Sequence, residues 1–186
     1  MAQYIALLRG INVGKNNAIG MADLKRMFEE LGLDNVQTYI RSGNVLFQSE
    51  DSEDVLRIKI ENEIEKRFGF SVAVILRTDM ELKHIIENCP FSEEEIAKAE
   101  SLFDGECLYI ALMGEVPLQE NIQHWGTYRN DSNKYKFDGR NVFLLFHHSI
   151  RDSKLASQIH KLGVPVTIRN LNTINKLVDL AGGVKK

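Results

Sequence analysis

Two short polar segments near the N-terminus contain residue types that bind anions. Their members are three cations and three hydrogen-bonding side chains: Arg9, Asn12 and Lys15 in the first segment, and Arg41, Ser42 and Asn44 in the second. Guanidinium and ammonium groups bind carboxylates and phosphates, and glycine-rich loops such as Gly10-Ile-Asn-Val-Gly14 present backbone N–H groups to the same ligands. If the fold brings the two segments together, they predict a site for a carboxylate or phosphate ligand.

The segment from Gly10 to Lys15 matches neither of two common nucleotide-binding loops. Three residues separate Gly10 from Gly14 where a P-loop has four, and Asn16 stands where Ser or Thr would hold magnesium. The G-x-G-x-x-G fingerprint of dinucleotide-binding proteins is missing as well. The sequence therefore argues against a standard ATPase and against a Rossmann dehydrogenase.

The spacing of apolar residues predicts a β-α-β-β-α-β series in the first half of the chain. The expected elements are strands over 4–9, 36–41, 44–49 and 71–77, and helices over 21–31 and 56–64. Gly32 and Gly69 follow the two helical patterns, and Ser42-Gly43 lies between the second and third strands. These glycines mark where the predicted elements end.

The same series returns in the second half. The expected elements are strands over 107–113, 134–137, 142–146 and 166–169, and helices over 118–125 and 153–162. The hairpin glycines Gly43 and Gly139 are 96 residues apart (139 minus 43). A last amphipathic helix is expected to start after Asn172 or Thr173.

We therefore expect an α+β protein of two tandem ferredoxin-like units packed together, with an extra C-terminal helix. The expected bounds are 1–78 for the first unit, 79–104 for a helical connector, 105–170 for the second unit and 171–186 for the C-terminal helix.

This topology would bring the two polar segments together. In a ferredoxin-like unit the first two strands run parallel with the third between them, so the end of strand one lies beside the hairpin after strand two. The alternative is that Arg9 and Arg41 only extend from strand ends, while the glycines and Asn12 shape loops. Residues 72–76 and 142–146 are apolar at successive positions, so we expect both faces of each sheet to be covered.

Composition narrows the classes of function. A net charge of -3 and a pI near 6.0 give no global reason to bind a polyanion. Cys89 and Cys107 lie far apart without a C-x-x-C pattern, so no disulfide, metal site or cofactor is expected. No apolar run approaches the length that crosses a bilayer, and no signal segment is evident, so we expect a soluble cytoplasmic protein without membrane contact.

Other candidate chemistry is less specific. His147-His148 precedes Arg151-Asp152, which would suit a general base oriented by a carboxylate, although histidines at strand ends are more often satisfied by backbone groups. Trp125, with neighbouring tyrosines, would line a pocket or pack in the core. No nucleophile, acid or base is singled out, so the sequence leaves open whether the protein is an enzyme.

The chain resembles a bacterial family catalogued as domain of unknown function 1697. The matching segments are Leu8-Arg-Gly-Ile-Asn-Val-Gly14, Thr38-Tyr-Ile-Arg-Ser-Gly-Asn-Val45, Leu162-Gly-Val-Pro165 and Thr167-Ile-Arg-Asn170 with Asn172-Thr-x-x-Lys-Leu177. The resemblance implies a two-unit α+β fold and brings no established activity. Its last motif adds Arg169, Asn170 and Lys176 as candidate ligand-binding residues, with helix capping by Asn or Thr as the alternative.

Three functions remain open at this stage. The first is binding or turnover of a small anionic or phosphorylated ligand by the residues named above. The second is association with nucleic acid, which the acidic net charge disfavours. The third is a structural or protein-interaction module in which the motifs only maintain turns. The sequence does not define an oligomeric state.

Overall fold

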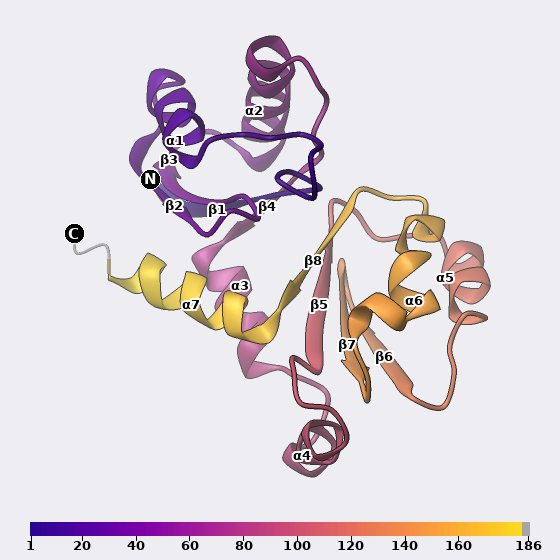
Figure 1. Ribbon diagram of the computed structural model, residues 1–186. Helices are drawn as coiled ribbons and strands as arrows, with labels where there is room; N and C mark the ends of the chain where they lie inside the picture. The colour runs from indigo at the N-terminus through magenta and orange to yellow at the C-terminus, as the bar shows by residue number, and fades with distance from the viewer. Residues whose placement is uncertain (184–186) are drawn as a thin grey trace. The chain divides into compact units, whose positions relative to one another are not determined.

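The computed structural model describes residues 1–183 and divides the chain into two compact units. The first comprises residues 1–84 together with the segment that begins at Asn175, and the second comprises residues 85–174. The described chain is an α+β protein with two four-stranded antiparallel sheets and seven α-helices (Figure 1). No helix among the described residues is long and apolar enough to cross a membrane.

The first unit is built in the order β-α-β-β-α-β. Its elements are β1 (Ala2–Leu8), α1 (Met21–Glu30), β2 (Asp34–Tyr39), β3 (Asn44–Ser49), α2 (Glu53–Phe68) and β4 (Val74–Thr78), after which α3 (Asp79–Glu87) begins. The strands lie in the order β2-β3-β1-β4, and every neighbouring pair is antiparallel. Helices α1 and α2 cover one face of this sheet (Figure 1). The predicted series of elements is confirmed, and the strand order is compatible with a ferredoxin-like unit.

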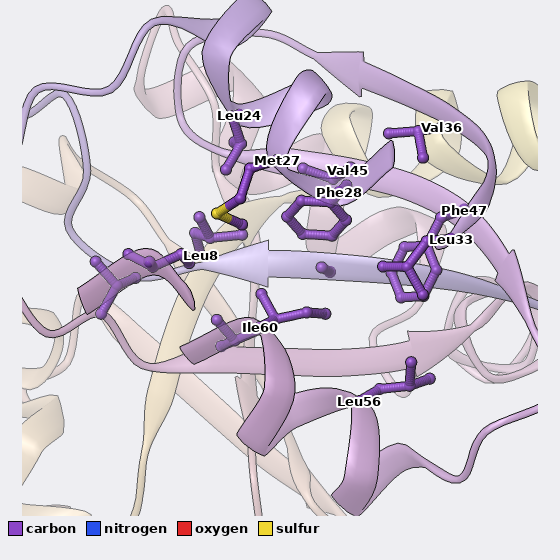
Figure 2. Close-up of a cluster of buried hydrophobic side chains, with 14 of the residues drawn as sticks. Leu8, Leu24, Met27, Phe28, Leu33, Val36, Val45, Phe47, Leu56 and Ile60 are labelled. Atoms are coloured by element: carbon purple, nitrogen blue, oxygen red, sulfur yellow. The ribbon is translucent and has the colours of Figure 1, made fainter. Parts of the chain in front are cut away.

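The core of the first unit lies between this sheet and its two helices. Alternate residues of β1, namely Tyr4, Ala6 and Leu8, pack there with Phe28 of α1 and Ile60 of α2, as Figure 2 shows for the labelled members. The residues between them on β1 are buried too, which places buried apolar side chains on both faces of the sheet. Residues 142–146 of the second sheet are buried at successive positions as well, so both runs carry buried side chains on the two faces of their strands, as expected.

The second unit repeats the series after helix α4 (Glu93–Leu102). Its elements are β5 (Leu108–Met113), α5 (Gln119–Gly126), β6 (Asn133–Asp138), β7 (Asn141–Phe146), a 3₁₀ turn (Ile150–Asp152), α6 (Lys154–Ser157), a second 3₁₀ turn (Ile159–Leu162) and β8 (Val166–Asn170). Helix α7 (Leu171–Gly182) begins directly after β8, and its residues from Asn175 onward belong to the first unit. The strand order is β6-β7-β5-β8, again antiparallel throughout. Position by position this is the order of the first sheet.

The two units have the same order of elements, and each contains an equivalent pair of internal backbone hydrogen bonds. Each closes the end of its first strand with one backbone bond to the hairpin and one to the segment before its last strand. The donor and acceptor pairs are Leu8 to Gly43 (2.8 Å) and Arg9 to Ala73 (3.0 Å) in the first unit, and Met113 to Arg140 (2.9 Å) and Gly114 to Pro165 (2.9 Å) in the second. In both units a helix directly follows the last strand, so α3 and α7 also correspond. The repeat can therefore be drawn one helix longer than the sequence pattern suggested.

The single helix predicted over residues 153–162 is wrong in detail. The structure has the four-residue helix α6, followed by a 3₁₀ turn that begins at Ile159. The indole Nε1–H of buried Trp125 donates to the carbonyl of Leu155 at 2.9 Å. In a continuous α-helix that carbonyl would accept from residue 159, so the indole takes the place of a helical hydrogen bond. Trp125 is therefore a core residue.

The start of the last helix also differs from the prediction. Helix α7 begins at Leu171, directly after β8, and not after Asn172 or Thr173. The side-chain oxygen of Asn170 accepts the backbone N–H of Thr173 at 2.8 Å, which satisfies one free donor of the first turn. Asn170 is thus the residue that caps the helix.

Candidate functional site

The end of strand β1 and the β2–β3 hairpin meet at one end of the first sheet. We call residues 9–20 and 40–44 the loop pole. Backbone bonds tie it together, because Leu8 N–H reaches the Gly43 carbonyl and Arg9 N–H reaches the Ala73 carbonyl just before β4. The structure therefore brings together the two polar segments that sequence analysis placed side by side.

Asn12 holds the loop pole in shape through its side-chain amide. Its Nδ2 donates to the carbonyls of Ile19 (3.0 Å) and Arg41 (2.9 Å), and its Oδ1 accepts the N–H of Ile19 (2.9 Å). One side chain thus closes the loop on itself and attaches it to the hairpin. Asn17 adds a bond from its Nδ2 to the Gly10 carbonyl at 3.3 Å. Asn12 is a positioning residue here, and its amide is used by the protein.

The loop pole is anchored below by apolar contacts. Ile11 and Ile19 are buried in the core of the first unit. Gly43 has φ +83°, and a Cβ at this position would lie 2.6 Å from Cδ1 of Ile11 and 3.0 Å from Cβ of Leu8. A residue with a side chain would therefore meet both backbone strain and a steric clash at Gly43. Glycine is therefore needed at position 43 so that Ile11 can pack against the hairpin turn.

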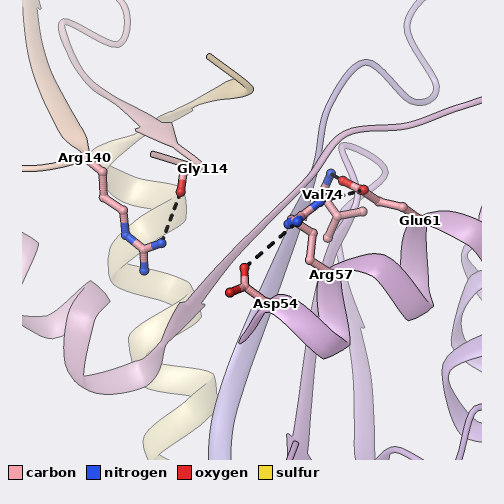
Figure 3. A network of polar contacts seen from close by, with 6 residues as sticks. All are labelled: Asp54, Arg57, Glu61, Val74, Gly114 and Arg140. Carbon is pink, nitrogen blue, oxygen red and sulfur yellow. Dashed lines mark hydrogen bonds and ion pairs between the residues drawn. The ribbon is translucent and has the colours of Figure 1, made fainter. Parts of the chain in front are cut away.

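The three cations of the loop pole are exposed to solvent. Arg9, Lys15 and Arg41 are exposed, and their side chains make no hydrogen bond or ion pair with any residue in the described range 1–183. Several other cations of the first unit form ion pairs, although Arg26 on α1 is also exposed without a partner among residues 1–183. Arg57, for example, bridges Asp54 and Glu61 (Figure 3).

The segments of the loop pole contain no carboxylate. Residues 9–20 and 40–44 include neither Asp nor Glu, and the nearest acidic residue along the chain is Asp23 in the first turn of α1. A Cβ built at Gly20 would lie 2.9 Å from Oδ2 of Asp23, so this carboxylate folds back over the start of the helix. Asp23 therefore occupies the helix N-terminus, and the positive charge available to a ligand is that of the three free cations.

Ser42 and Asn44 serve the hairpin more directly than a ligand. Asn44 is fully buried, and its Nδ2 donates to the Tyr39 carbonyl (3.0 Å) and to Oγ of Ser42 (3.1 Å). Ser42 is half-buried. Of the six residues that sequence analysis assigned to this site, three present charge to solvent and three build the turn or loop.

The other three candidates are on β8 and α7, outside the segments that form the loop pole. Arg169, on β8, is about nine-tenths buried; its Nη1 donates to Oγ1 of Thr167 (2.8 Å) and to the Ile168 carbonyl (3.0 Å). Burial lowers the pKa of Arg169 to about 10. Asn170 caps α7, and Lys176 is exposed on that helix. Their common membership of one ligand site stays a prediction.

Sequence analysis missed Arg77, which is the counterpart of Arg169 in the first unit. Arg77 pairs with Ile5 across β1 and β4, as Arg169 pairs with Ile110 across β5 and β8. Arg77 is almost fully buried, and its Nη1 donates to the Leu76 carbonyl at 2.8 Å. The signal was present in the sequence, since both last strands end with arginine followed by a small polar residue.

The second unit contains a basic cluster of a different kind. A surface hollow of about 350 Å³ is lined in part by Lys134 and Lys136 of β6. Lys134 pairs with Glu95 at 2.9 Å, while Lys136 donates to the Pro90 carbonyl (3.0 Å) and lies over the ring of Phe91. These ammonium groups are satisfied by the protein itself, which distinguishes them from the cations of the loop pole.

Among residues 1–183, no carboxylate contacts the histidine pair after β7 in the way that a general base would need. Nδ1 of His148 lies 2.8 Å from the Ser149 carbonyl, and Nε2 lies 2.8 Å from Oδ1 of buried Asn133. Desolvation, followed by nearby cations, lowers the pKa of His147. Because both ring nitrogens of His148 face oxygen atoms of its own unit, this histidine joins a structural network.

The described residues show no metal centre. No group of three or more His, Cys, Asp or Glu residues within 1–183 is arranged to hold a metal ion, and both thiols are free. Burial, with Glu100 and Glu106 nearby, raises the pKa of the Cys107 thiol. A raised thiol pKa is the opposite of what a reactive nucleophile needs.

These features define a two-unit α+β protein whose first unit carries an unneutralised cationic loop pole. The chain belongs to the family described as protein of unknown function (DUF1697), whose profile matches residues 1–143. This confirms the resemblance recognised from the sequence motifs. A solved structure of the conserved bacterial protein SP0830 from Streptococcus pneumoniae is similar, with 26% sequence identity, 98% of this chain and 99% of that chain covered, and a TM-score of 0.76. A search of curated proteins finds no match.

Proposed function

We propose that the first unit binds a small anionic or phosphorylated ligand at the loop pole, through Arg9, Lys15 and Arg41. One observation carries the proposal. These three cations have no partner among residues 1–183, and they lie on segments that contain no carboxylate. Free guanidinium and ammonium groups on an ordered loop can each supply a charge-assisted hydrogen bond to a carboxylate or phosphate.

The second unit supports this assignment because it builds the same junction without these cations. Gly114 takes the place of Arg9 in the shared pair of backbone hydrogen bonds. The loop that follows, residues 114–118, is shorter than residues 9–20 and contains Glu115. The cation on the corresponding hairpin, Arg140, has an acceptor, because its Nη1 donates to the Gly114 carbonyl at 3.4 Å (Figure 3). The fold itself therefore does not require the longer loop or its charges.

The remaining members of the site have supporting roles in this proposal. Asn12 fixes the loop against the hairpin, while Ser42 and Asn44 shape the turn from which Arg41 extends. A loop that is ordered before binding loses less conformational freedom when the ligand arrives. The proposal assigns no catalytic step, since no acid, base or nucleophile lies among these residues.

The scaffold and location complete the proposal. We assign each unit to the ferredoxin-like class, supported by the strand orders β2-β3-β1-β4 and β6-β7-β5-β8 and by the β-α-β-β-α-β series. A cytoplasmic location is favoured by the two free thiols, because reducing compartments keep cysteines unpaired.

Titration calorimetry with alanine variants tests the proposal. Inorganic phosphate and a panel of phosphorylated metabolites and nucleotides are titrated at constant ionic strength, so that general screening does not change. We expect Arg9→Ala and Arg41→Ala each to weaken binding roughly ten-fold or more, since each removes a charge-assisted hydrogen bond. The control is Arg26→Ala on helix α1. Arg26 is also exposed and has no partner among residues 1–183, but it lies outside the loop pole.

Two outcomes of the titrations, and one outcome of a separate retention assay on nucleic acid, would count against the proposal. Binding that is absent for every anion, or equally weakened by Arg26→Ala, would show that the loop pole has no special affinity. Tight retention on single-stranded DNA or RNA that falls steeply with salt and requires Arg9 and Arg41 would instead favour a nucleic-acid partner.

A further inference from the structure

Two exposed apolar side chains accompany the cations of the loop pole. Val13 is 67% exposed and Ile40 is 46% exposed. Val13 directly follows Asn12, and Ile40 directly precedes Arg41. Because Nδ2 of Asn12 donates to the Arg41 carbonyl at 2.9 Å, the two apolar residues flank a single contact between loop and hairpin. The loop pole therefore combines apolar surface with free positive charge.

The backbone at Ile40 is unusual for its residue type. Four non-glycine residues within 1–183 have positive φ: Asn12, Asn17, Asn35 and Ile40. Asparagine tolerates the left-handed region, whereas a β-branched side chain is strained there. Ile40, at φ +49°, also remains nearly half exposed, so burial does not compensate this strain fully. Strained residues of this kind concentrate at functional sites.

Single exposed apolar residues are ordinary on protein surfaces, so exposure alone proves little. Here three features coincide: the strain at Ile40, the exposure of Val13 next to Asn12, whose amide contacts the Arg41 carbonyl, and the free cations on the same two segments. Asparagine or glycine at position 40 would relieve the strain and would remove the apolar side chain. The isoleucine at this position therefore places exposed apolar surface next to Arg41 on a strained backbone.

We propose that the ligand of the loop pole is a soluble amphipathic anion, in which an apolar ring or short chain lies beside a phosphate or carboxylate group. The charged group contacts Arg9, Lys15 or Arg41, and the apolar group covers Val13 and Ile40. This inference rests on the proposed anion-binding function and adds the class of ligand. Two β-branched side chains provide apolar area for one small group, which favours a metabolite over a lipid surface.

The test compares two anions that differ in their apolar part. Inorganic phosphate and phenyl phosphate are titrated into the wild-type protein and its variants by calorimetry at constant ionic strength. We expect phenyl phosphate to bind about ten-fold more tightly than inorganic phosphate, because its ring buries apolar surface against Val13 and Ile40. Ile40→Asn and Val13→Ser should remove most of this preference and leave phosphate affinity unchanged. The control Val55→Ser changes an exposed valine of α2 and should leave the preference intact.

Ile40→Asn carries a second readout that a purely structural role would not give. Asparagine suits the left-handed backbone, so the variant should melt at a higher temperature than wild type while it loses the preference for phenyl phosphate. If this variant fails to fold, Val13→Ser alone decides the question.

The outcomes separate this inference from the proposed function. If phosphate binds through Arg9 and Arg41 but phenyl phosphate binds no more tightly, the amphipathic ligand is wrong and anion binding stands. If neither anion binds, both proposals fall. Retention on vesicles of phosphatidic acid and phosphatidylcholine, lost in Ile40→Asn and without any preference for phenyl phosphate, would overturn the soluble ligand in favour of a lipid surface.

Discussion

At the scale of single residues, Asn12 makes the clearest contribution to the loop pole. Its amide makes three hydrogen bonds, which involve both backbone groups of Ile19 and the Arg41 carbonyl. Asn12→Ala should lower the free energy of unfolding by about 1–3 kcal/mol, because it leaves these backbone groups unpaired. Urea denaturation measures the loss. Asn16→Ala, at an exposed neighbour in the same loop, should change it by less than about 0.5 kcal/mol, and equal losses would contradict the role of Asn12.

The hairpin glycines form a matched pair for a second prediction. Gly43 and Gly139 both have positive φ, yet a Cβ would clash with Ile11 at Gly43 and would meet nothing within 4 Å at Gly139. Gly139→Ala should therefore cost about 1–2 kcal/mol of stability from backbone strain alone. Gly43→Ala should cost clearly more, since steric overlap is added. Thermal or urea unfolding of the two variants gives the comparison, and a larger loss at Gly139 would refute the packing of Ile11 on the turn.

The residue types of the loop pole could be predicted from the sequence, but their division of labour could not. Arginine, lysine and asparagine all suit an anion site, so the sequence alone makes Asn12 and Arg41 equally good candidates for ligand binding. The structure separates them, because the Asn12 amide is saturated by backbone groups while the Arg41 guanidinium is free. The positive φ of Ile40 could not be predicted from the sequence, because isoleucine rarely adopts the left-handed region.

At the scale of elements, the start of helix α4 gives a prediction about pH. Ser92 and Glu95 form a capping box, and Glu95 also pairs with Lys134 of β6. The Ser92 backbone N–H, followed by Lys134, lowers the pKa of Glu95 to about 2. A lowered pKa in the folded state stabilises the protein above the ordinary carboxyl pKa, and this contribution is lost as pH falls from about 4.5 to about 2.

Glu95→Gln tests this account because glutamine can keep the cap while it loses the charge. At neutral pH the variant should melt below wild type, and the difference should shrink toward zero as pH approaches about 2. Glu94→Gln removes a neighbouring exposed charge and serves as the control. A difference between wild type and Glu95→Gln that persists unchanged in acid would show that Glu95 acts through something other than its charge.

Most elements were predictable because their apolar periodicity is regular. The strands of both sheets, together with α1 and α2, lie where the pattern placed them, to within a few residues. The break between α6 and the following turn was not predictable. It depends on a hydrogen bond from Trp125 to Leu155, thirty residues apart in the chain, and the stripe of Leu155, Ile159 and Leu162 fits a continuous helix equally well.

At the scale of the whole molecule, the repeated order of elements serves as an internal control. Both units share element order, strand order and the pair of backbone bonds that closes the first strand. The two units differ in the length and charge of the loop that follows. What the units share is explained by the fold, and what only the first unit has is the place to look for function. The sequence pattern already indicated this repeat. The hairpin glycines are not strictly equivalent, because the residue that corresponds to Gly43 in the backbone hydrogen bonds is Arg140, one position after Gly139.

The measurement that tests the central claim most directly is a titration of inorganic phosphate followed by amide NMR spectra of the full chain at constant ionic strength. The account predicts shift changes in residues 9–20 and 40–44 that saturate with phosphate, and none in the corresponding loops over 114–118 and 138–141. Changes that are absent, or equally large in the loops of the second unit, would contradict anion binding at the loop pole.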